Sequence, residues 1–434
     1  MKPALRELAA AMNRSDPAAA FAFRLWDGEV IGYGDRPKTS LVIKSSKVLE
    51  ELFTKGFLGF GEAYMSGDLE VEEDLQELLR LGLIVRFDES AFSLKEKIRL
   101  LPFYLKTMAT EAGSRKNIAH HYDLTPEFYS LFLDETLTYS CGYFANADDS
   151  LEQAQRRKYD HIARKLLLGP ADTLVDIGCG WGGMLLHSAL HYGAAAVGVT
   201  LSSNQHQYGC RRIEELGLGQ RVEVKLQDYR QLTGTFDKFV SIGMFEHVGK
   251  RFIPVFMRRV AGLLRKGGTG LLHTISKEVE SATDAWMRRY IFPGGYIPSL
   301  PETIREMGRA GLCVVDIEAL RMHYARTLDC WISNFERNIS RIQQLFDERF
   351  IRMWRLYLNA CSASFKYGGI RIYQILFTNG LNNDLPMTRE YVYRSIQPKA
   401  EDENPPQTQV VDRPGRRRRG TRPRTGDSKP KTKN

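Results

Sequence analysis

The clearest indication of the fold is the segment Leu174-Val175-Asp176-Ile177-Gly178-Cys179-Gly180-Trp181-Gly182-Gly183. It predicts a buried β-strand, then a glycine-rich turn, then a helix that begins near Met184. Glycines at 178, 180 and 182 let the backbone turn sharply and approach a ligand without an intervening Cβ. The amides exposed at the start of a helix suit a carboxylate or a phosphate. Taken alone, the same stretch also fits an ordinary tight connection between a strand and a helix.

The spacing of the glycines separates two kinds of nucleotide site. The dinucleotide fingerprint G-x-G-x-x-G fits poorly, because the order here is G-x-G-x-G-G and Asp176 stands at the end of the strand. Asp176-x-Gly178-x-Gly180-x-Gly182 instead resembles motif I of the class I S-adenosylmethionine-dependent methyltransferases. That resemblance implies S-adenosylmethionine as the cofactor.

Further apolar runs follow the glycine loop in a regular order. They predict strands over 195–200, 222–226, 236–243 and 270–275, alternating with helical patterns. Such alternation predicts an α/β fold with a Rossmann-like, doubly wound parallel sheet. Polar clusters stand at the carboxyl ends of these strands, where sheets of this kind bind ligands. In a class I methyltransferase these clusters would serve the methionine moiety, the ribose and the adenine, with Asp228 near the adenine amine.

The length of 434 residues exceeds what one domain usually needs. We expect an N-terminal α+β domain associated with lipid or membrane over 1–105, whose first hairpin turns at Asp27-Gly28. A linker over 106–117 and the catalytic domain over 118–395 follow. Part of an amphipathic basic helix over 93–110 falls in this linker; it suits a membrane surface or a bridge between domains. A disordered basic tail over 396–434 ends the chain.

The net charge of +9 is concentrated in the tail. Residues 413–434 hold ten Lys or Arg and one Asp, a surplus that equals the charge of the whole chain, so the remainder is about neutral. One interpretation is an electrostatic arm for anionic phospholipid, at about 1 kcal/mol per basic residue near such a surface. A solvated appendage and a nucleic-acid contact are the alternatives.

The cysteines and the apolar runs bear on the compartment. Six cysteines are scattered without C-x-x-C spacing, which argues against a zinc site or a disulfide framework and favours a reducing cytoplasm. We predict no metal site. The charged amphipathic N-terminus does not resemble a signal peptide, and no apolar run approaches the roughly 18 residues of a membrane span. The sequence predicts a cytoplasmic protein, soluble or peripherally bound to the inner face of the membrane.

Several further segments narrow the family. They are His120–Leu124, Thr138–Phe144, Gly243–Gly249, Leu272–Ile275 and Tyr357–Cys361. In order and spacing they resemble the cyclopropane-fatty-acyl-phospholipid synthases and the mycolic acid cyclopropane synthases, over nearly the whole chain from Phe21 to Arg394. Gly61–Asp68 matches the phospholipid-acting branch, since the mycolate branch lacks that domain.

The resemblance implies methylenation of a cis double bond in a phospholipid acyl chain, with peripheral membrane association. The alkene attacks the sulfonium methyl, and a base must then remove a proton from the resulting cation so that the ring can close. In this family the base is taken to be bound bicarbonate. The matching positions are Cys141, Glu246, His273, the Ile275 backbone and Tyr324. A homodimer remains open.

Two of the implied catalytic residues also have ordinary structural interpretations. His273 alone would suit a histidine that caps a strand. Cys361 has been regarded as catalytic in this family, although the mechanism needs no covalent nucleophile and a cysteine on an apolar helix is often a core residue. A bare Glu246 carboxylate would repel bicarbonate, so hydrogen bonds or a shared proton must offset that repulsion.

The cofactor and substrate contacts follow from the same resemblance. The cofactor positions are Tyr139, Ser140, Asp176, Gly178, Gly180, Gly182, Thr200, Leu201, Gln205, Asp228 and Tyr229. The segment 284–300 suggests a lid or an apolar substrate wall. Four aromatic residues either stabilise a cation through their ring faces or line the acyl channel; they are Tyr290, Phe292, Trp331 and Phe335.

Three other functions compete with this one. An enzyme of the same family could stop at a methyl or methylene branch. Nucleic-acid methylation is disfavoured because Gly243–Glu246 stands where amino-methylating enzymes carry a Pro-Pro motif, so we expect no nucleic-acid partner. A non-catalytic lipid-binding protein is disfavoured by the intact Glu246, His273 and Tyr324.

Overall fold

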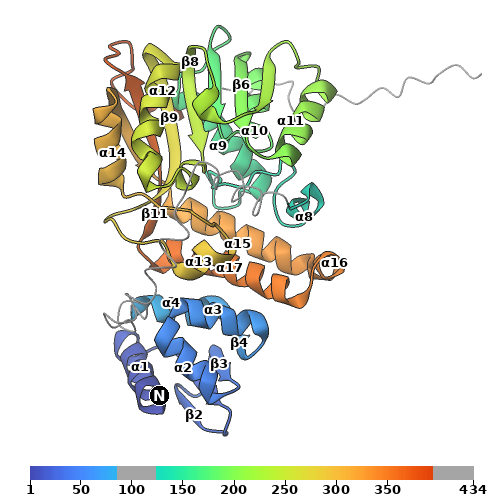
Figure 1. Cartoon of the computed structure of the whole chain (residues 1–434), viewed down its shortest axis with the longest axis vertical. Helices are drawn as coiled ribbons and strands as arrows, with labels where there is room; N and C mark the ends of the chain where they lie inside the picture. The colour runs from blue at the N-terminus through green and yellow to red at the C-terminus, as the bar shows by residue number, and fades with distance from the viewer. Residues whose placement is uncertain (86–123, 394–434) are drawn as a thin grey trace, which may run out of the picture. The chain divides into compact units, whose positions relative to one another are not determined.

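The computed structural model describes residues 1–85 and 124–393 (Figure 1). The amphipathic helix expected over 93–110, the linker over 106–117 and the tail over 396–434 lie outside the described residues. So do the domain boundary near 105 and most of the segment His120–Leu124. A compact unit runs from Met1 to Val392, and a second unit begins at Tyr393.

The N-terminal residues form a four-stranded sheet in the order β2-β1-β3-β4. The hairpin predicted around Asp27-Gly28 is confirmed, since β1 and β2 pair antiparallel and Gly28 has φ +86°. Asp74 caps the helix that follows β4 by accepting from two backbone amides. The elements are α1 (Lys2–Ser15), β1 (Phe21–Leu25), β2 (Val30–Tyr33), β3 (Thr39–Ile43), α2 (Ser46–Lys55), α3 (Phe57–Ser66), β4 (Leu69–Glu73) and α4 (Leu75–Ile84).

The larger sheet has seven strands in the order β10-β11-β9-β8-β5-β6-β7. Its strands are β5 (Thr173–Ile177), β6 (Ala195–Thr200), β7 (Val222–Leu226), β8 (Phe236–Ile242), β9 (Leu264–Lys277), β10 (Leu312–Ala319) and β11 (Ile370–Asn379). All five predicted strands are present and parallel. Sequence reasoning missed β10 and β11, which complete the sheet antiparallel to their neighbours.

The helices of this part alternate with the strands and continue beyond them. They are α8 (Pro126–Ser130), α9 (Leu151–Lys165), α10 (Gly183–Tyr192), α11 (Ser203–Glu215), α12 (Ile253–Leu263), α13 (Ala285–Tyr290), α14 (Leu300–Arg309), α15 (Arg321–Arg337), α16 (Ile339–Leu345), α17 (Glu348–Tyr367) and α18 (Glu390–Tyr393). Three short 3-10 helices cover Tyr229–Gln231, Phe245–His247 and Lys250–Phe252.

Successive buried residues of the central strands face two different cores, as a doubly wound sheet requires. Leu174 packs with α9 and α10, whereas its neighbour Val175 packs with α12 and α14. The same alternation separates Leu271 from Leu272 on β9. The sheet is therefore covered by helices on both faces, and its ligand site is confined to an edge.

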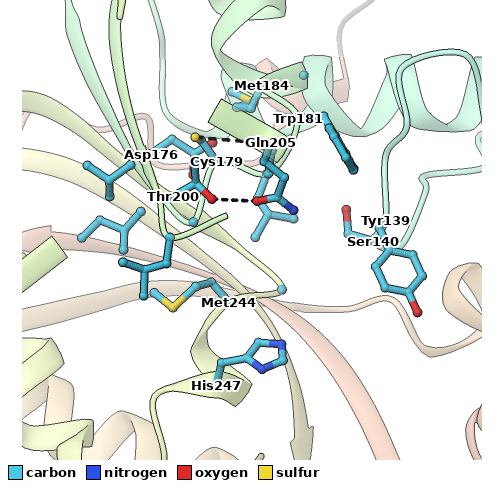
Figure 2. Close-up of a pocket in the computed structure, with 18 of the residues that line it drawn as sticks. Tyr139, Ser140, Asp176, Cys179, Trp181, Met184, Thr200, Gln205, Met244 and His247 are labelled. Carbon is cyan, nitrogen blue, oxygen red and sulfur yellow. Dashed lines mark hydrogen bonds between the residues drawn. The ribbon is translucent and has the colours of Figure 1, made fainter. Parts of the chain in front are cut away.

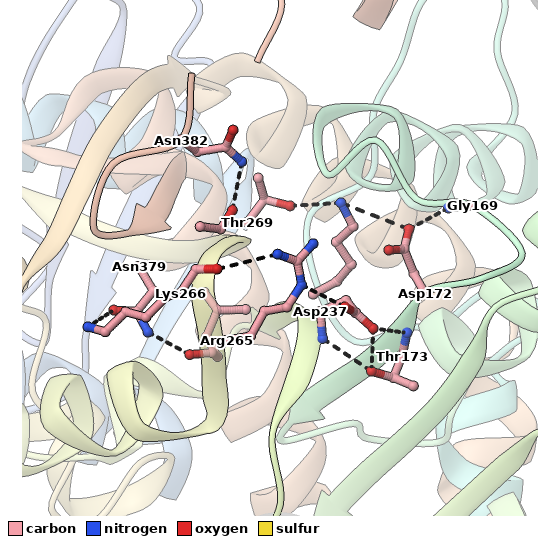
Figure 3. A network of polar contacts seen from close by, with 12 residues as sticks. Gly169, Asp172, Thr173, Asp237, Arg265, Lys266, Thr269, Asn379 and Asn382 are labelled. Carbon is pink, nitrogen blue, oxygen red and sulfur yellow. Dashed lines mark hydrogen bonds and ion pairs between the residues drawn. The ribbon is translucent and has the colours of Figure 1, made fainter. Parts of the chain in front are cut away.

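Polar contacts join β5, β8 and β9 at their amino ends (Figure 3). The Asp237 carboxylate accepts from the Thr173 amide at 2.9 Å and from the Thr173 hydroxyl at 2.7 Å. Arg265 donates to the other oxygen of Asp237 at 2.6 Å, and Lys238 donates to the Thr269 hydroxyl at 3.2 Å. These contacts fix the strand register at the end opposite to the glycine loop, which leaves the carboxyl edge free for a ligand.

Helices α15 and α17 pack against each other, and α17 also packs against the N-terminal helices α3 and α4. Arg352 on α17 donates through Nη2 to the Leu69 carbonyl at 2.9 Å and to Glu70 at 2.8 Å. Trp286 on α13 packs directly on Gly61 of α3, where an added Cβ would lie 2.2 Å from the indole nitrogen. The N-terminal part thus shares one apolar core with α13, α15 and α17.

Candidate active site

The glycine loop has the backbone that its sequence predicts. Gly178, Gly180 and Gly182 all have positive φ, at +84°, +54° and +90°. A Cβ on Gly178 would lie 2.5 Å from the Met244 side chain, whereas one on Gly180 would meet nothing within 4 Å. The loop is therefore tight on the side of β8 and open on the other side, immediately before α10 begins at Gly183.

A pocket at the carboxyl ends of β5, β6 and β8 contains the predicted cofactor positions (Figure 2). Ten of the eleven residues line it: Tyr139, Ser140, Asp176, Gly178, Gly180, Thr200, Leu201, Gln205, Asp228 and Tyr229. Gly182 does not line it and instead caps α10. Sequence reasoning missed several lining residues, among them Lys158, Met244 and His247.

Lys158 and Asp176 are buried charged residues in the lining of this pocket. Lys158 is 0% exposed and donates to the Ser140 hydroxyl at 2.9 Å. Burial lowers the pKa of Lys158 to about 7, and burial raises the pKa of Asp176 to about 7. One oxygen of Asp176 has no hydrogen-bond partner among the described residues. Sequence reasoning missed Lys158, although a lysine on the apolar side of α9 was a signal of a buried charge.

The remaining polar residues of the pocket are held by neighbours. The Thr200 hydroxyl donates to Gln205 Oε1 at 2.7 Å, which leaves the Gln205 amide nitrogen for another acceptor. Asp228 forms an ion pair with Arg230 and also accepts from its backbone amide at 2.9 Å. The Tyr229 ring packs edge-on against Phe256, with centroids 5.4 Å apart. These contacts fix a carboxylate, an amide and a ring around one cavity.

This set of groups fits S-adenosylmethionine. The unpartnered oxygen of the buried Asp176 suits a cationic group. The open side of Gly180 leaves room for a close backbone approach, and Trp181, Tyr139 and Tyr229 supply flat aromatic surfaces. When bound, the cofactor supplies an electrophilic methyl group on a sulfonium.

None of the six predicted catalytic residues lines this pocket, and three of them, Glu246, His273 and Ile275, lie on or just after β8 and β9. Glu246 follows the end of β8, and its Oε1 accepts from the Ile275 backbone amide on β9. Strand β8 ends at Ile242, which lies opposite His273 on β9. Ile275 lies beyond the end of β8, and its amide donates to Glu246 instead of to a β8 carbonyl. The amide that the family resemblance assigns to an anion is thus used by Glu246 in this structure.

Glu246 and His273 each retain one unused polar atom. Glu246 Oε2 and His273 Nε2 are buried and have no hydrogen-bond partner among the described residues. Burial raises the pKa of Glu246 to about 6, and burial lowers the pKa of His273 well below its ordinary value. Buried polar atoms without partners are costly, so this pair is a candidate for ligand contact.

The other three predicted catalytic residues pack in the apolar core that also contains Ile275. Cys141 is 0% exposed, and its thiol donates to the Gly142 carbonyl at 3.2 Å. The Tyr324 ring lies 4.6 Å from that of Phe365. Desolvation raises the pKa of the Cys361 thiol to about 12, so it remains protonated at neutral pH. The Cys361 side chain is therefore a thiol and not the nucleophilic thiolate, which agrees with a mechanism that needs no covalent nucleophile.

Aromatic rings connect the cofactor pocket to this core. Tyr139, which lines the pocket, stacks on Trp331 at 5.2 Å and shares a 2.6 Å hydroxyl contact with Tyr357. His247, on another wall, packs edge-on against Phe292 at 5.5 Å. All four predicted aromatic residues, Tyr290, Phe292, Trp331 and Phe335, belong to the same core. The segment expected to form a substrate wall therefore does face an apolar interior.

Comparison with known proteins identifies the class. Residues 110–375 match the family model for mycolic acid cyclopropane synthetase, and residues 10–93 match a domain of unknown function (DUF7884). A probable fatty acid methyltransferase of Pseudomonas putida is 37% identical over 86% of this chain and 95% of its own length. The cyclopropane-fatty-acyl-phospholipid synthase of Escherichia coli is 35% identical over 80% of this chain and 90% of its own.

A solved structure of a cyclopropane synthase is similar to this chain as well. The mycolic acid cyclopropane synthase CmaA1 in complex with SAH and CTAB has a TM-score of 0.58 and 33% identity, over 61% of this chain and 98% of that chain. The fold and the pocket define a class I S-adenosylmethionine-dependent methyltransferase. The chain belongs to the mycolic acid cyclopropane synthetase family, whose members modify lipid acyl chains by cyclopropanation or methylation.

Within 1–85 and 124–393, no helix is both long and apolar enough to cross a bilayer. In the same ranges, no group of three or more His, Cys, Asp or Glu side chains is arranged to hold a metal ion.

Proposed function

We propose that the protein converts cis double bonds of membrane phospholipid acyl chains into cyclopropane rings, using S-adenosylmethionine as the methylene source. The observation that supports this most is the pair Glu246 and His273, each buried with one unused polar atom. Glu246 follows the carboxyl end of β8, and His273 on the neighbouring parallel strand β9 lies opposite the last residue of β8. Methyl transfer to a nitrogen or an oxygen releases an N–H or O–H proton, which exchanges readily with water. Ring closure must instead remove a proton from carbon inside an apolar core, and that step needs a positioned acceptor.

The chemistry sets out what these residues must do. The alkene π electrons form a bond to the methyl carbon as its bond to sulfur breaks, which leaves a carbocation on the acyl chain. A proton must then leave the new methyl carbon so that its C–H electrons close the ring. The acceptor has to be small, fixed in place and shielded from water, because water would capture the cation.

We propose bicarbonate as that acceptor, held by Glu246, His273, Tyr324 and Cys141. The Ile275 amide orients the Glu246 carboxylate by donating to it, rather than contacting the anion. Bicarbonate has one hydroxyl and two further oxygens. It can therefore donate to Glu246 Oε2 and accept from an N–H or O–H donor. With the pKa of Glu246 at about 6, the carboxylate is mostly ionised at pH 7.5 and able to accept that hydroxyl. Cys361 has no part in this scheme.

The apolar core beside the pocket suits an acyl chain. Trp331 and Phe335 are 0% and 1% exposed, and Phe292 joins them in the same core. Ring faces in such a dry site can stabilise a cation by up to about 2 kcal/mol each. We propose that the enzyme reaches its substrate as a peripheral protein on the inner face of the cell membrane, with the N-terminal part contributing to lipid contact.

The alternative product is a methyl- or methylene-branched chain. This alternative is supported by the name of the Pseudomonas putida relative, a probable fatty acid methyltransferase. A methylene branch and a ring both add one CH₂ to the lipid, but the methylene branch keeps a double bond and the ring does not. A saturated methyl branch would need the carbocation to accept a hydride from an added reductant, so its product would be heavier than the cyclopropane product by two hydrogen atoms.

The test combines turnover with bicarbonate supply. Purified protein is incubated with S-adenosylmethionine and vesicles of monounsaturated phospholipid, in bicarbonate-depleted buffer and with bicarbonate restored. We expect a lipid product heavier by one CH₂, formed faster when bicarbonate is present. Equal rates in both buffers would overturn the bicarbonate proposal, and a product that still takes up hydrogen would favour the branched alternative.

A further inference from the structure

A row of polar side chains crosses the sheet beside His273. Gln374 on β11 lies directly opposite His273 on β9, and Glu318 on β10 lies opposite Gln374. Lys165 from α9 reaches the same row, donating to Gln374 Oε1 at 2.9 Å and pairing with Glu318. Lys165, Gln374 and His273 are each at most 2% exposed. Neither the glycine loop nor the proposed anion contacts account for this row.

The row fixes the direction of each hydrogen bond. A lysine ammonium can only donate, so the Gln374 atom that faces Lys165 is the carbonyl oxygen. The amide nitrogen of Gln374 then faces His273 Nδ1, at 3.3 Å. An amide nitrogen also can only donate, so Nδ1 must accept and carries no proton. In a neutral imidazole the proton is therefore on Nε2.

The state of the imidazole agrees with this assignment. Burial lowers the pKa of His273, and the positive charges of Lys158 and Lys165 lower it further, so the ring is neutral at physiological pH. Glu318 and His161 lie on the far side of Lys165 and are joined by a 2.7 Å contact. Nε2 is the buried atom that has no partner among the described residues. His273 thus offers one N–H, directed away from Gln374.

We infer that Gln374, oriented by Lys165, is a positioning residue that holds His273 as the Nε2–H tautomer. His273 can then donate to the anion that acts as the base in the proposed reaction. In the other tautomer, Nε2 would present a lone pair and repel an anion. The inference rests on the proposed function for the identity of that anion. The tautomer itself depends on the hydrogen-bond row alone.

The first test reads the tautomer directly. The full-length protein is labelled with ¹⁵N in its histidine rings, and long-range ¹H–¹⁵N correlations are recorded at pH 7.5 without added bicarbonate. His273→Gln identifies the His273 signals among the nine histidines. We expect a protonated-type Nε2 and an unprotonated-type Nδ1 in the wild-type protein. The reverse pattern, or a charged ring, would overturn the inference without any variant at Gln374.

The second test reverses the row with one substitution. In Gln374→Glu, one carboxylate oxygen still accepts from Lys165, and the other now accepts from His273, which forces a proton onto Nδ1. We expect the His273 shifts to exchange or to become those of a charged ring. We also expect kcat to fall by at least about tenfold, because the bound base loses a hydrogen bond that positions it, with unchanged affinity for S-adenosylhomocysteine.

Gln153→Glu is the matched control, because Gln153 accepts from the Ser150 amide at 2.9 Å in a capping box that glutamate also forms. It should leave both the His273 shifts and turnover unchanged. Unaltered His273 shifts in a folded Gln374→Glu variant would contradict the inference. A wild-type Nε2–H tautomer together with bicarbonate-independent turnover would support the tautomer assignment and overturn the bicarbonate proposal, so the two failures are distinguishable.

Discussion

Glu246 combines deep burial with two unequal oxygens. One oxygen accepts from the Ile275 amide, and the other has no partner among the described residues. The variant Glu246→Gln would retain the first contact through its amide carbonyl oxygen while losing the negative charge. This substitution therefore separates the structural contact of the residue from its chemical one.

Glu246→Gln should reduce turnover by at least about a hundredfold, on the scale of losing a positioned catalytic group. Binding of S-adenosylhomocysteine should change little, because Glu246 does not line the cofactor pocket. Calorimetric titration beside a lipid turnover assay checks both parts. Loss of cofactor affinity would mean that the role assigned to Glu246 is misplaced.

The same substitution should change the pH dependence of stability. Burial raises the pKa of Glu246 from 4.5 to about 6, so the folded protein binds the proton more tightly than the unfolded chain does. The folding stability that comes from this tighter proton binding at Glu246 is fully present below pH 4.5 and is lost as pH rises through 6. Above pH 6 the wild-type protein therefore carries a penalty of about 2 kcal/mol that Glu246→Gln lacks.

Urea unfolding at pH 4.5 and pH 7.5 measures this difference. The stability gain of Glu246→Gln over the wild-type protein should be larger at pH 7.5. Glu135→Gln is the control, since the Glu135 side chain is 65% exposed and pairs with Arg156 at the surface. A gain for Glu246→Gln that is the same at both pH values would contradict the buried, raised-pKa account.

Sequence reasoning was most successful at the residues of the cofactor pocket and least successful at their supports. The glycine spacing, the strand ends and the family resemblance predicted ten lining residues, because a parallel strand fixes where its carboxyl end lies. Lys158, Lys165 and Gln374 were missed. Each becomes meaningful through a partner far away in sequence, and no local pattern distinguishes a buried lysine from an exposed one.

Among the elements, strands β10 and β11 show the limit of periodicity. Strand β11 follows the long helix α17 as the parallel strands follow theirs, but the pattern of its residues does not indicate its direction. Its place between β9 and β10 brings Gln374 beside His273. An expectation of parallel βα repeats alone therefore predicts the edge of the sheet that holds the cofactor pocket. It does not predict β11, the strand that places Gln374 beside His273.

The contact between α3 and α13 gives a prediction about packing. Gly61→Ala places a Cβ 2.2 Å from the Trp286 indole nitrogen, and Trp286 is 0% exposed with little space to move. The variant should lose about 1–3 kcal/mol of unfolding free energy. Gly82→Ala is the matched control in α4, because a Cβ there meets nothing within 4 Å.

Since alanine favours helix more than glycine does, Gly82→Ala should stabilise by up to about 1 kcal/mol. Denaturant titration of both variants measures the pair. If Gly61→Ala were as stable as Gly82→Ala, then Trp286 would not be packed on α3 as described. The wall formed by α13 would in that case be independent of the N-terminal part.

At the scale of the whole molecule, the charge distribution predicts how the protein meets a membrane. The tail from Arg413 to Asn434 holds a surplus of nine positive charges in the sequence, and it lies outside the described residues. Deleting Arg413–Asn434 should weaken binding to vesicles that contain anionic phospholipid. The difference between the two proteins should shrink as salt is raised, since screening reduces the attraction.

Vesicle sedimentation at low and high salt, with zwitterionic vesicles as the control lipid, measures this effect. Equal binding of the full chain and the truncated chain to anionic vesicles would reduce the tail to a solvated appendage. The catalytic proposal does not depend on that outcome, because none of its residues lies beyond Val392.

Ring formation is tested by mass spectrometry of monounsaturated phospholipid after incubation with the protein and S-adenosylmethionine, followed by catalytic hydrogenation. We expect a lipid that gains one CH₂ and takes up no hydrogen, which is the behaviour of a cyclopropane ring. A product that gains one CH₂ and still takes up hydrogen would contradict ring closure and show a methylene-branched chain instead.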